Sequence, residues 1–461
     1  MNYDIVVLGS GPGGYVAAIR ASQLGLKAAI IEKESLGGIC LNWGCIPTKA
    51  LLKSASVYND MKHADEYGLL SKDFSFDFGK VVSRSRSVAD GMSNGVQFLM
   101  KKNKIDVYEG FGKLISSTKI EVKNDKETKT LEGKFIIIAT GARARELPNL
   151  PLDGEKIIEY RKAMTLDKLP EEMVVVGSGA IGCEFSYFYQ SMGTKVTLVE
   201  YLPNILPVED EEVSKQLARS FKKSKMTVMT NSSVESVDTS GKKCKVTIKT
   251  KKGEEVVEAD VVLSAVGIVA NIEGIGLEEV GVATDSGKII VDDFGQTNIP
   301  NIYAIGDVVA GPALAHVASH EGIVAVEKMA GKSPEPNDKS NIPSCTYTVP
   351  EVASVGMTEK AAKEAGHEIK VGKFPFSASG KASAANHKEG FVKLIFDAKY
   401  GELLGGHLIG YNVTEMIADL VSIRKLETTG EEIIKTIHPH PTMSEAIMEA
   451  AAEAYDECIH L

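Results

Sequence analysis

Two cysteines, Cys40 and Cys45, lie in the stretch GGICLNWGCIPTKALL, which spans residues 37–52. Such a pair serves a protein as metal ligands, as inert buried thiols, or as a disulfide that forms and breaks. No histidine or further cysteine stands beside the pair at metal-ligand spacing, which disfavours a metal site. Glycines flank the pair and the polar Asn42 lies inside it, so its surroundings favour a redox pair over inert core thiols.

A bridge between these two sulfurs requires an irregular backbone. Five residues of regular helix rise about 7.5 Å, whereas the Cα atoms of a disulfide lie about 4.4–6.8 Å apart. Pro47 lacks the N–H that would bond to the carbonyl of Trp43, and Gly44 relaxes the backbone beside Cys45. We therefore predict a distorted turn and a reducible bridge at this position.

Lys49 stands one helical turn beyond Cys45. A lysine there and a helix N-terminus would both stabilise a thiolate. The alternative for Lys49 is an ordinary solvated lysine on a helix.

Thiol exchange also needs a proton acceptor, and His440 in HPHPTMSE is the best candidate among the nine histidines. Prolines on both sides restrict its backbone, and Glu445 at a predicted helix start is placed to orient the imidazole. His438 in the same stretch is the competing candidate, for which we expect a structural role.

An internal repeat positions cofactors for this chemistry. Residues 9–32 (GSGPGGYVAAIRASQLGLKAAIIE) resemble residues 177–200 (GSGAIGCEFSYFYQSMGTKVTLVE). In both copies a β-branched strand precedes the glycines, an amphipathic helix follows, and a second strand ends in an acidic residue. This pattern predicts two βαβ units that bind dinucleotides. The motif residues are Gly9, Gly11, Gly14 and Glu32 in the first copy, and Gly177, Gly179, Gly182 and Glu200 in the second.

Each motif residue has an expected task. The first glycine allows the tight turn, the second lets the backbone approach a pyrophosphate, and the third lets the helix pack closely on the strand. The diphosphate then lies at the helix N-terminus, and the acidic residue accepts a hydrogen bond from a ribose 2′-hydroxyl. The alternative is that the glycines serve only turns.

Two dinucleotide sites in one chain suggest two cofactors that exchange electrons, a flavin (FAD) and a nicotinamide (NAD). At the second site a 2′-phosphate would meet the carboxylate of Glu200. Because like charges repel, we expect that site to prefer NAD over NADP.

Three further segments carry predicted roles. Residues 135–144 (FIIIATGARA) and 261–272 (VVLSAVGIVANI) read as buried strands followed by glycine turns, each closing a nucleotide domain. Asp307 follows a strand and is expected to bind ribityl hydroxyls of the flavin, with the N–H groups of residues 313–316 facing the flavin ring. The alternative for Asp307 is a helix N-cap. Residues 331–343, rich in Pro, Lys and Asn, are a predicted linker.

Length and composition limit the remaining alternatives. A chain of 461 residues is too long for one core and is expected to form several domains. A formal net charge of −10 without a basic stripe argues against nucleic acid as a partner. The six cysteines form no disulfide framework, and we find no membrane span and no targeting segment. We therefore expect a cytoplasmic location, or the mitochondrial matrix if a transit peptide was removed.

Seven stretches along the whole chain resemble the flavin-dependent pyridine nucleotide-disulfide oxidoreductases, and within them the dihydrolipoamide dehydrogenase branch. In order they are GSGPGGYVAA, GGICLNWGCIPTKALL, ATGARA, GSGAIGCE, NIYAIGDV, ALAHVASHEG and HPHPTMSE. One departure is Trp43, which is bulky where members usually carry a smaller residue. We expect it to alter access near the disulfide and to leave the chemistry intact.

The resemblance implies an α/β fold with two Rossmann-like βαβ domains, a central segment and a C-terminal α+β domain. The expected domains are 1–145 for FAD, 146–270 for NAD, 271–340 completing the FAD site and 341–461 for dimerisation. Further cofactor-binding positions are expected at Lys49, Gly112, Thr140, Gly141, Glu184, Gly267, Asp307, Ala313, Leu314, Ala315 and His316.

The resemblance also implies roles for the redox residues. Cys40 corresponds to the thiol that meets the substrate, and Cys45 to the thiolate that contacts the flavin in a charge-transfer complex. Lys49 corresponds to the lysine near flavin N5, with Glu184 as its ion-pair partner.

His440 corresponds to the general base and Glu445 to the residue that orients it, both reaching the disulfide from the other subunit of a homodimer. The implied activity is oxidation of dihydrolipoamide to lipoamide with NAD⁺. The implied partner is a lipoyl-bearing acyltransferase of a 2-oxo acid dehydrogenase complex, or a glycine-cleavage carrier protein. The alternatives are a glutathione-reductase-like NAD(P)H-dependent enzyme and a non-enzymatic flavoprotein subunit.

Overall fold

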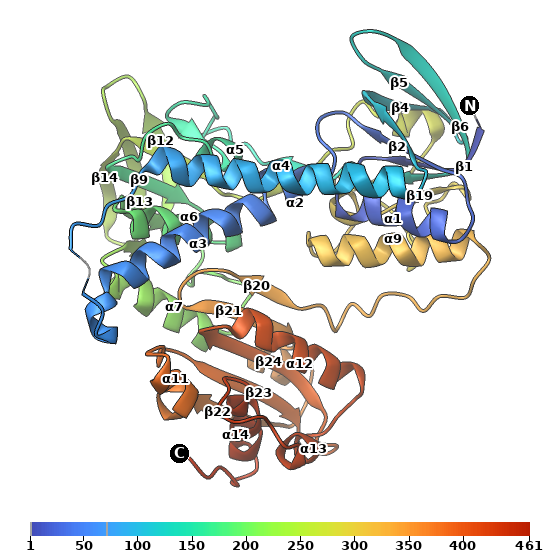
Figure 1. Cartoon of the computed structure of the whole chain (residues 1–461). Coiled ribbons are helices and arrows are strands. Elements are labelled where there is room, and N and C mark those ends of the chain that lie inside the picture. The colour runs from blue at the N-terminus through green and yellow to red at the C-terminus, as the bar shows by residue number, and fades with distance from the viewer. Residues whose placement is uncertain (1, 71) are drawn as a thin grey trace. The chain divides into compact units, whose positions relative to one another are not determined.

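The computed structural model describes residues 2–70 and 72–461, which separate into two compact units (Figure 1). Unit 1 comprises Met1–Leu51, Gly79–Arg145 and Gly267–Asn337, and unit 2 comprises Leu52–Phe78, Glu146–Val266 and Asp338–Leu461. The division into four domains stays a prediction, because the two units do not mark its inner boundaries. Among the described residues, no helix is both long and apolar enough to cross a membrane.

Unit 1 is built on a seven-stranded sheet with the strand order β3-β2-β1-β6-β5-β4, in which β19 also pairs with β6. Strands β3, β2, β1, β6 and β19 run parallel, whereas β5 and β4 are antiparallel. The seven strands are β1 (Asn2–Leu8), β2 (Ala28–Glu32), β3 (Asp106–Glu109), β4 (Phe111–Ser116), β5 (Lys119–Lys123), β6 (Thr128–Ile138) and β19 (Ile302–Ala304).

Strand β1 shows why this sheet is covered on both faces. Ile5 and Val7 belong to the core beneath the helices α1 (Pro12–Gln23) and α9 (Ala315–Met329), while Val6 and Leu8 belong to the core on the opposite face. A strand that is apolar on both faces is typical of parallel sheets.

Helices α1 and α9 lie side by side (Figure 1). A Cβ on Gly13 would lie 2.9 Å from the carbonyl oxygen of Ala318, and one on Gly322 would lie 2.8 Å from that of Gly13. The two glycines therefore let the helix backbones approach closely. The other elements of unit 1 are α2 (Gly38–Trp43), α4 (Phe78–Lys102), β7 (Ala142–Ala144), β16 (Ile268–Ala270), α8 (Leu277–Val280), β17 (Thr284–Asp285), β18 (Lys288–Ile289) and η2 (Gly306–Val308). Helix α3 (Cys45–Lys62) begins in unit 1 and ends in unit 2.

Unit 2 contains the second parallel sheet, with the order β11-β10-β9-β15-β8. Its strands and helices are β8 (Ile157–Ile158), α5 (Tyr160–Ala163), β9 (Glu172–Val176), α6 (Ala180–Met192), β10 (Lys195–Val199), α7 (Glu211–Lys223), β11 (Thr227–Met229) and β15 (Val261–Ser264). An antiparallel sheet, β12 (Ser233–Asp238), β13 (Cys244–Thr250) and β14 (Gly253–Ala259), packs against it through a shared apolar core. The prediction of two βαβ units is confirmed, since β1 pairs parallel with β2 and β9 with β10.

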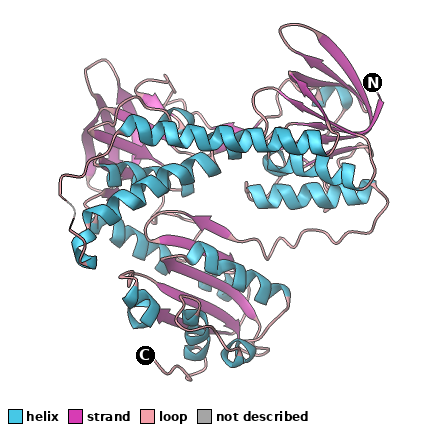
Figure 2. Cartoon of the chain, in the orientation of Figure 1, coloured by secondary structure: helices cyan, strands magenta, loops and turns pink. Residues whose placement is uncertain are grey.

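The C-terminal part of unit 2 is an antiparallel sheet with the order β20-β21-β24-β23-β22 (Figure 2). Helices α12 and α14 share an apolar core with this sheet, which gives the expected α+β arrangement. The elements of this part are β20 (Ser344–Thr346), β21 (Glu351–Gly356), α10 (Glu359–Glu364), β22 (Ile369–Pro375), η3 (Phe376–Ala378), α11 (Gly380–Ala384), β23 (Phe391–Asp397), β24 (Leu403–Gly410), α12 (Val413–Lys425), α13 (Gly430–Lys435) and α14 (Glu445–Glu453). Unit 2 also contains η1 (Ala64–Tyr67), which follows α3 in the chain.

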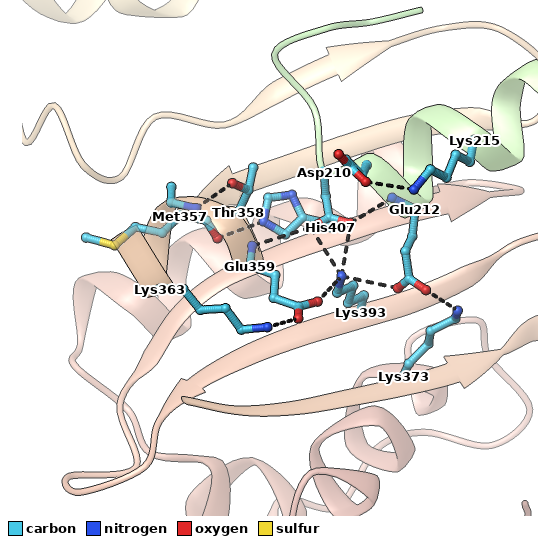
Figure 3. A network of polar contacts seen from close by, with 12 residues as sticks. Asp210, Glu212, Lys215, Met357, Thr358, Glu359, Lys363, Lys373, Lys393 and His407 are labelled. Atoms are coloured by element: carbon cyan, nitrogen blue, oxygen red, sulfur yellow. Dashed lines mark hydrogen bonds and ion pairs between the residues drawn. The ribbon is translucent and has the colours of Figure 1, made fainter. Parts of the chain in front are cut away.

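A buried lysine joins α7 to this C-terminal sheet (Figure 3). Lys393 on β23 has a side chain only 2% exposed, and its Nζ lies 3.0 Å from Asp210, 3.2 Å from Glu212 and 2.7 Å from Glu359. Asp210 also accepts the N–H of Glu212 and so caps the N-terminus of α7. One cation therefore connects residues far apart in the chain.

The charges around Lys393 explain why it tolerates burial. An ammonium group out of water is costly unless it is paired. Hydrogen bonds from Lys363 and Lys393 lower the pKa of Glu359 to about 2, and although burial opposes it, Lys393 also holds the pKa of Asp210 below its ordinary value. Both carboxylates are therefore ionised at neutral pH. Burial lowers the pKa of the neighbouring His407, whose Nε2 lies 2.8 Å from the carbonyl oxygen of Met357.

We predict that Lys393→Met lowers the free energy of unfolding at pH 7 by about 3–5 kcal/mol, because carboxylates remain buried without their partner. Urea denaturation measures this change. Lys388→Met, at an exposed position on the loop before β23, is the matched control. Equal urea midpoints for the two variants would contradict the prediction.

The same network predicts acid sensitivity. The pKa of Glu359 is lower in the folded chain than its ordinary value of 4.5, so its contribution to stability is present above pH 4.5 and is lost as the pH falls toward 2. The urea midpoint of the wild type should decline over this range more steeply than that of Lys393→Met.

Candidate active site

The turn between β1 and α1 has the geometry expected of a dinucleotide cradle. Gly9 has φ +102°, and a Cβ there would lie 2.3 Å from the carbonyl oxygen of Ala139. A Cβ on Gly14 would lie 2.0 Å from the carbonyl oxygen of Gly9, whereas one on Gly11 would meet nothing within 4 Å. The first and third glycines are thus required by the turn and the helix packing, and the second leaves open space.

The turn between β9 and α6 repeats this geometry. Gly177 has φ +94°, and a Cβ there would lie 2.5 Å from the carbonyl oxygen of Ala265. A Cβ on Gly182 would lie 1.9 Å from the carbonyl oxygen of Gly177, and one on Gly179 would meet nothing within 4 Å. The residues at both turns therefore fit a bound diphosphate at a helix N-terminus.

The acidic residue of each motif is held by the serine between the first two glycines. Glu32 accepts hydrogen bonds from the N–H of Ser10 at 3.0 Å and from its Oγ at 2.6 Å. Glu200 accepts the same pair from Ser178 at 2.9 and 2.6 Å. The sequence analysis missed these serines, although GSG occurs in both copies of the repeat. Both carboxylates are thereby oriented at the end of a strand, where a ribose is expected.

Cys40 and Cys45 form a disulfide with their Cα atoms 4.7 Å apart. Helix α2 ends at Trp43, and Gly44 breaks the backbone with φ −143° and ψ −114° before α3 begins at Cys45. A Cβ on Gly44 would lie 3.1 Å from the carbonyl oxygen of Ile39, so a glycine suits this close approach. The predicted distortion and bridge are confirmed.

Pro47 lies directly after this distortion, as the sequence predicts. It occupies the first turn of α3 and lacks the N–H that a helix continuous with α2 would bond to the carbonyl of Trp43. Gly44 alone occupies the break between the two helices.

The position of Cys45 favours a thiolate once the bridge is reduced. Its sulfur belongs to the first residue of α3, and Lys49 follows in the next turn. The positive end of a helix and a nearby cation both stabilise a thiolate. The other four cysteines form no disulfide, and burial raises the pKa of Cys183 and Cys244. Among the described residues, no group of His, Cys, Asp or Glu could hold a metal ion.

Side chains of helix α4 form hydrogen bonds with the backbone around the disulfide. The sequence analysis did not predict these contacts. Its side chains donate hydrogen bonds to carbonyl oxygens before, between and after the two cysteines. The donor and acceptor pairs are Ser93 to Leu36, Arg86 to Asn42, Ser85 to Pro47 and Arg84 to Ala50. No local sequence signal marks these contacts, because the donors lie 34 to 57 residues away from their acceptors.

The glycines after the two closing strands adopt turn conformations. Gly141 has φ +68° and Gly267 has φ +107°, and Thr140 donates from Oγ1 to the carbonyl oxygen of Asn271 at 2.7 Å. Gly112 lies in β4, where a Cβ would come within 2.4 Å of the Leu8 side chain, so packing requires a glycine there. Cofactor binding by these residues stays a prediction.

Asp307 lies in η2 and does not cap α9, whose N-cap is Leu314. Burial raises the pKa of Asp307, with Lys288 opposing the shift. No described residue donates a hydrogen bond to its carboxylate, which suits an expected contact with ligand hydroxyls. The backbone N–H groups of Ala315 and His316 lie in the first turn of α9. The roles of residues 313–316 stay predictions.

His440 and Glu445 form the pair that the sequence predicts. Nδ1 of His440 lies 2.8 Å from Oε1 of Glu445, whose Oε2 accepts the N–H of Thr442 at 2.8 Å. Although burial alone would raise it, these contacts hold the pKa of Glu445 below its ordinary value. The His440 side chain is 77% exposed. His438 instead contacts the carbonyl oxygen of Thr436 at 2.9 Å.

Glu184 is 4% exposed and accepts the N–H of Tyr347 at 3.0 Å. Lys49 belongs to unit 1 and Glu184 to unit 2. The ion pair between them therefore stays a prediction.

Curated relatives named dihydrolipoyl dehydrogenase are similar to the chain over its whole length. The protein from Zymomonas mobilis is 48% identical and the match covers 100% of this chain and 99% of the relative. The Rhizobium etli protein is 49% identical with the same coverage. The Bacillus subtilis protein is 46% identical over 99% of both chains.

Solved structures are similar as well. LpdA from Mycobacterium tuberculosis matches with a TM-score of 0.91 and 29% identity, over 97% of this chain and 98% of LpdA. The HOCl-induced flavoprotein disulfide reductase RclA from Escherichia coli matches with a TM-score of 0.87 and 26% identity, over 98% of this chain and 99% of RclA.

Two family models cover most of the sequence. Residues 3–322 match the pyridine nucleotide-disulphide oxidoreductase model, and residues 342–451 match the dimerisation domain of the same family. The dimerisation domain supports the expected homodimer, and FAD and NAD are the cofactors. On the two glycine cradles, the disulfide and these matches, the chain belongs to the pyridine nucleotide-disulphide oxidoreductase family.

Proposed function

We propose that the chain oxidises protein-bound dihydrolipoamide to lipoamide, with NAD⁺ as the final electron acceptor. The observation that carries this proposal is the Cys40–Cys45 disulfide at the start of α3, in a chain with two dinucleotide cradles. The curated relatives named dihydrolipoyl dehydrogenase support the choice of substrate.

The disulfide accepts the substrate's two electrons. One thiolate of dihydrolipoamide attacks Sγ of Cys40, so the Cys40–Cys45 bond breaks and Cys45 leaves as a thiolate. The second substrate thiol then attacks the mixed disulfide, which releases lipoamide and leaves Cys40 reduced. The α3 N-terminus and Lys49 stabilise the Cys45 thiolate.

The two cofactors fit the cradles of the two βαβ units. We assign FAD to Gly9, Gly11, Gly14 and Glu32, and NAD to Gly177, Gly179, Gly182 and Glu200. FAD, when bound, supplies an isoalloxazine ring that takes electrons from a thiolate and passes hydride to a nicotinamide. The protein supplies the positioning.

His440 is the proposed general base for the substrate thiol. Its Nδ1 contacts Glu445, which leaves Nε2 for proton transfer. Glu445 is ionised at neutral pH and stabilises the imidazolium that forms. We further propose that this pair serves the disulfide of the other subunit in the homodimer.

The proposed partner is a lipoyl-bearing acyltransferase of a 2-oxo acid dehydrogenase complex or a glycine-cleavage carrier, because a lipoyl arm presents a dithiol to a fixed site. We also propose a cytoplasmic location. Four cysteines that form no disulfide are compatible with a reducing compartment.

The first test is NAD⁺ reduction by dihydrolipoamide with the purified holoenzyme. We expect turnover in the wild type and its loss in Cys45→Ser, because a serine oxygen cannot form the disulfide. Cys345→Ser, at a cysteine outside the disulfide, is the control and should keep its activity. A Cys45→Ser variant that still turns over would exclude the proposed route, and reduction of a different disulfide with NADPH would exclude the substrate.

We predict that Glu200→Ala raises KM for NAD⁺ about tenfold, because a hydrogen bond from a ribose hydroxyl to a carboxylate is lost. The preference for NAD⁺ over NADP⁺ should fall at the same time. Glu211→Gln, at an exposed residue of α7, is the control. Unchanged kinetics in Glu200→Ala would remove this residue from the nucleotide site.

We predict that Glu445→Gln lowers kcat about a hundredfold with FAD content unchanged, because His440 loses the charge that supports its protonated form. His438→Gln should leave kcat within about twofold, since the His438 ring contacts the carbonyl oxygen of Thr436, whereas Glu445 bonds to His440. If both variants behave alike, His440 is not the base.

A further inference from the structure

Arg86 on α4 is the charged group bound to the segment between the two cysteines. One of its nitrogens, Nη2, donates to the carbonyl oxygen of Asn42, near the C-terminus of α2. Helix C-termini carry unpaired carbonyls and a partial negative charge, which a guanidinium neutralises. Arg86 therefore caps α2 at the point where the backbone turns toward Cys45.

Trp43 holds this guanidinium in place. The carbon at the centre of the Arg86 guanidinium lies 4.2 Å from the centroid of the Trp43 ring, within the range of a cation–π contact. The indole N–H of Trp43 donates to Oε1 of Glu34 at 3.0 Å, which fixes the ring in turn. The bulky residue that departs from the expected pattern thus supports the arginine.

The way in which Arg86 is buried does not favour the stability of the fold. The second nitrogen of Arg86, Nη1, is buried and has no hydrogen-bond partner among the described residues. A buried donor of a charged group without an acceptor is unfavourable. Burial lowers the pKa of Arg86 while Asp90 raises it, and a guanidinium stays charged at neutral pH.

The position of the charge matters for redox chemistry. Asn42 lies two residues after Cys40 and three before Cys45, so the cation is bound to the short segment that joins the two sulfurs. Two-electron reduction breaks the S–S bond and, with uptake of one proton, leaves one thiol and one thiolate. A nearby positive charge stabilises that anion and so favours the reduced pair.

We propose that Arg86 is a positioning residue for the Cys40–Cys45 pair: it is stacked on Trp43 and bound to Asn42, holds the segment between the cysteines, and favours its thiolate-bearing reduced state. The inference rests on the proposed function in one respect, that this pair is the one that is reduced in turnover. The other charged groups around the segment are Glu34, Asp90, Lys49 and Arg84.

The test is the reduction midpoint of the pair in the full-length holoenzyme. The protein is equilibrated without oxygen in mixtures of reduced and oxidised dithiothreitol, free thiols are alkylated, and mass spectrometry of the peptide carrying Cys40 and Cys45 gives the reduced fraction. We expect Arg86→Met to require about a tenfold higher ratio of reduced to oxidised dithiothreitol, a shift of about 30 mV. Arg86→Lys, which keeps the charge, should shift the ratio by less than about threefold.

Arg84→Met is the matched control. Arg84 lies on the same helix and donates to the carbonyl oxygen of Ala50 at 2.8 Å, beyond the cysteine pair. Removing its charge should shift the midpoint by less than about threefold, because the bonded carbonyl lies outside the segment between the cysteines. Equal shifts in Arg84→Met and Arg86→Met, or none in Arg86→Met, would overturn the proposal.

If Arg86→Met does not retain FAD, Trp43→Leu decides the question. It keeps the charge and removes the ring that holds it, and we expect about a threefold shift in the same direction. An unchanged midpoint in Trp43→Leu would then refute the role of the stack. If dithiothreitol cannot reduce the wild-type pair reversibly, the proposed function itself is refuted. This outcome differs from a reversible wild-type pair whose midpoint the variants leave unchanged, which would refute only the role of Arg86.

Discussion

The close approach of a helix to the strand before it governs both nucleotide sites of this protein. The carbonyl oxygen of Gly9 occupies the place where a side chain on Gly14 would begin, and the carbonyl oxygen of Gly177 does the same at Gly182. Any larger residue would push the helix N-terminus away from the end of the sheet. The unpaired N–H groups there are what an anionic cofactor needs. The serine between the first two glycines then orients the acidic residue of each motif.

The redox centre follows a second constraint of the same kind. Two cysteines on one regular helix could not bridge, so the backbone ends one helix and starts another at Gly44. That break creates a helix C-terminus and a helix N-terminus within a few residues of the sulfurs. Arg86 neutralises the first, and the second favours a Cys45 thiolate. The partial charges at the C-terminus of α2 and at the N-terminus of α3 therefore both influence the reduced cysteine pair.

Charge has a different task in unit 2. Lys393 and its three carboxylates link the N-terminus of α7 to the C-terminal sheet, and no redox or cofactor residue takes part (Figure 3). Such a buried network stabilises only while every partner is present, since each group alone would be costly to bury. His440 and Glu445 belong to the same unit but remain accessible, as proton transfer requires.

The sequence by itself determined the parts that depend on local pattern. Both βαβ units, the cysteine pair and the His440–Glu445 contact could be read from spacing, because each involves residues close in the chain or a repeated motif. Tertiary structure alone decided the rest. It brought α4 against the disulfide segment and buried Lys393 beside Asp210, a residue 183 positions away. These contacts arise when distant elements pack together, and no periodicity along the chain encodes which side chains then meet.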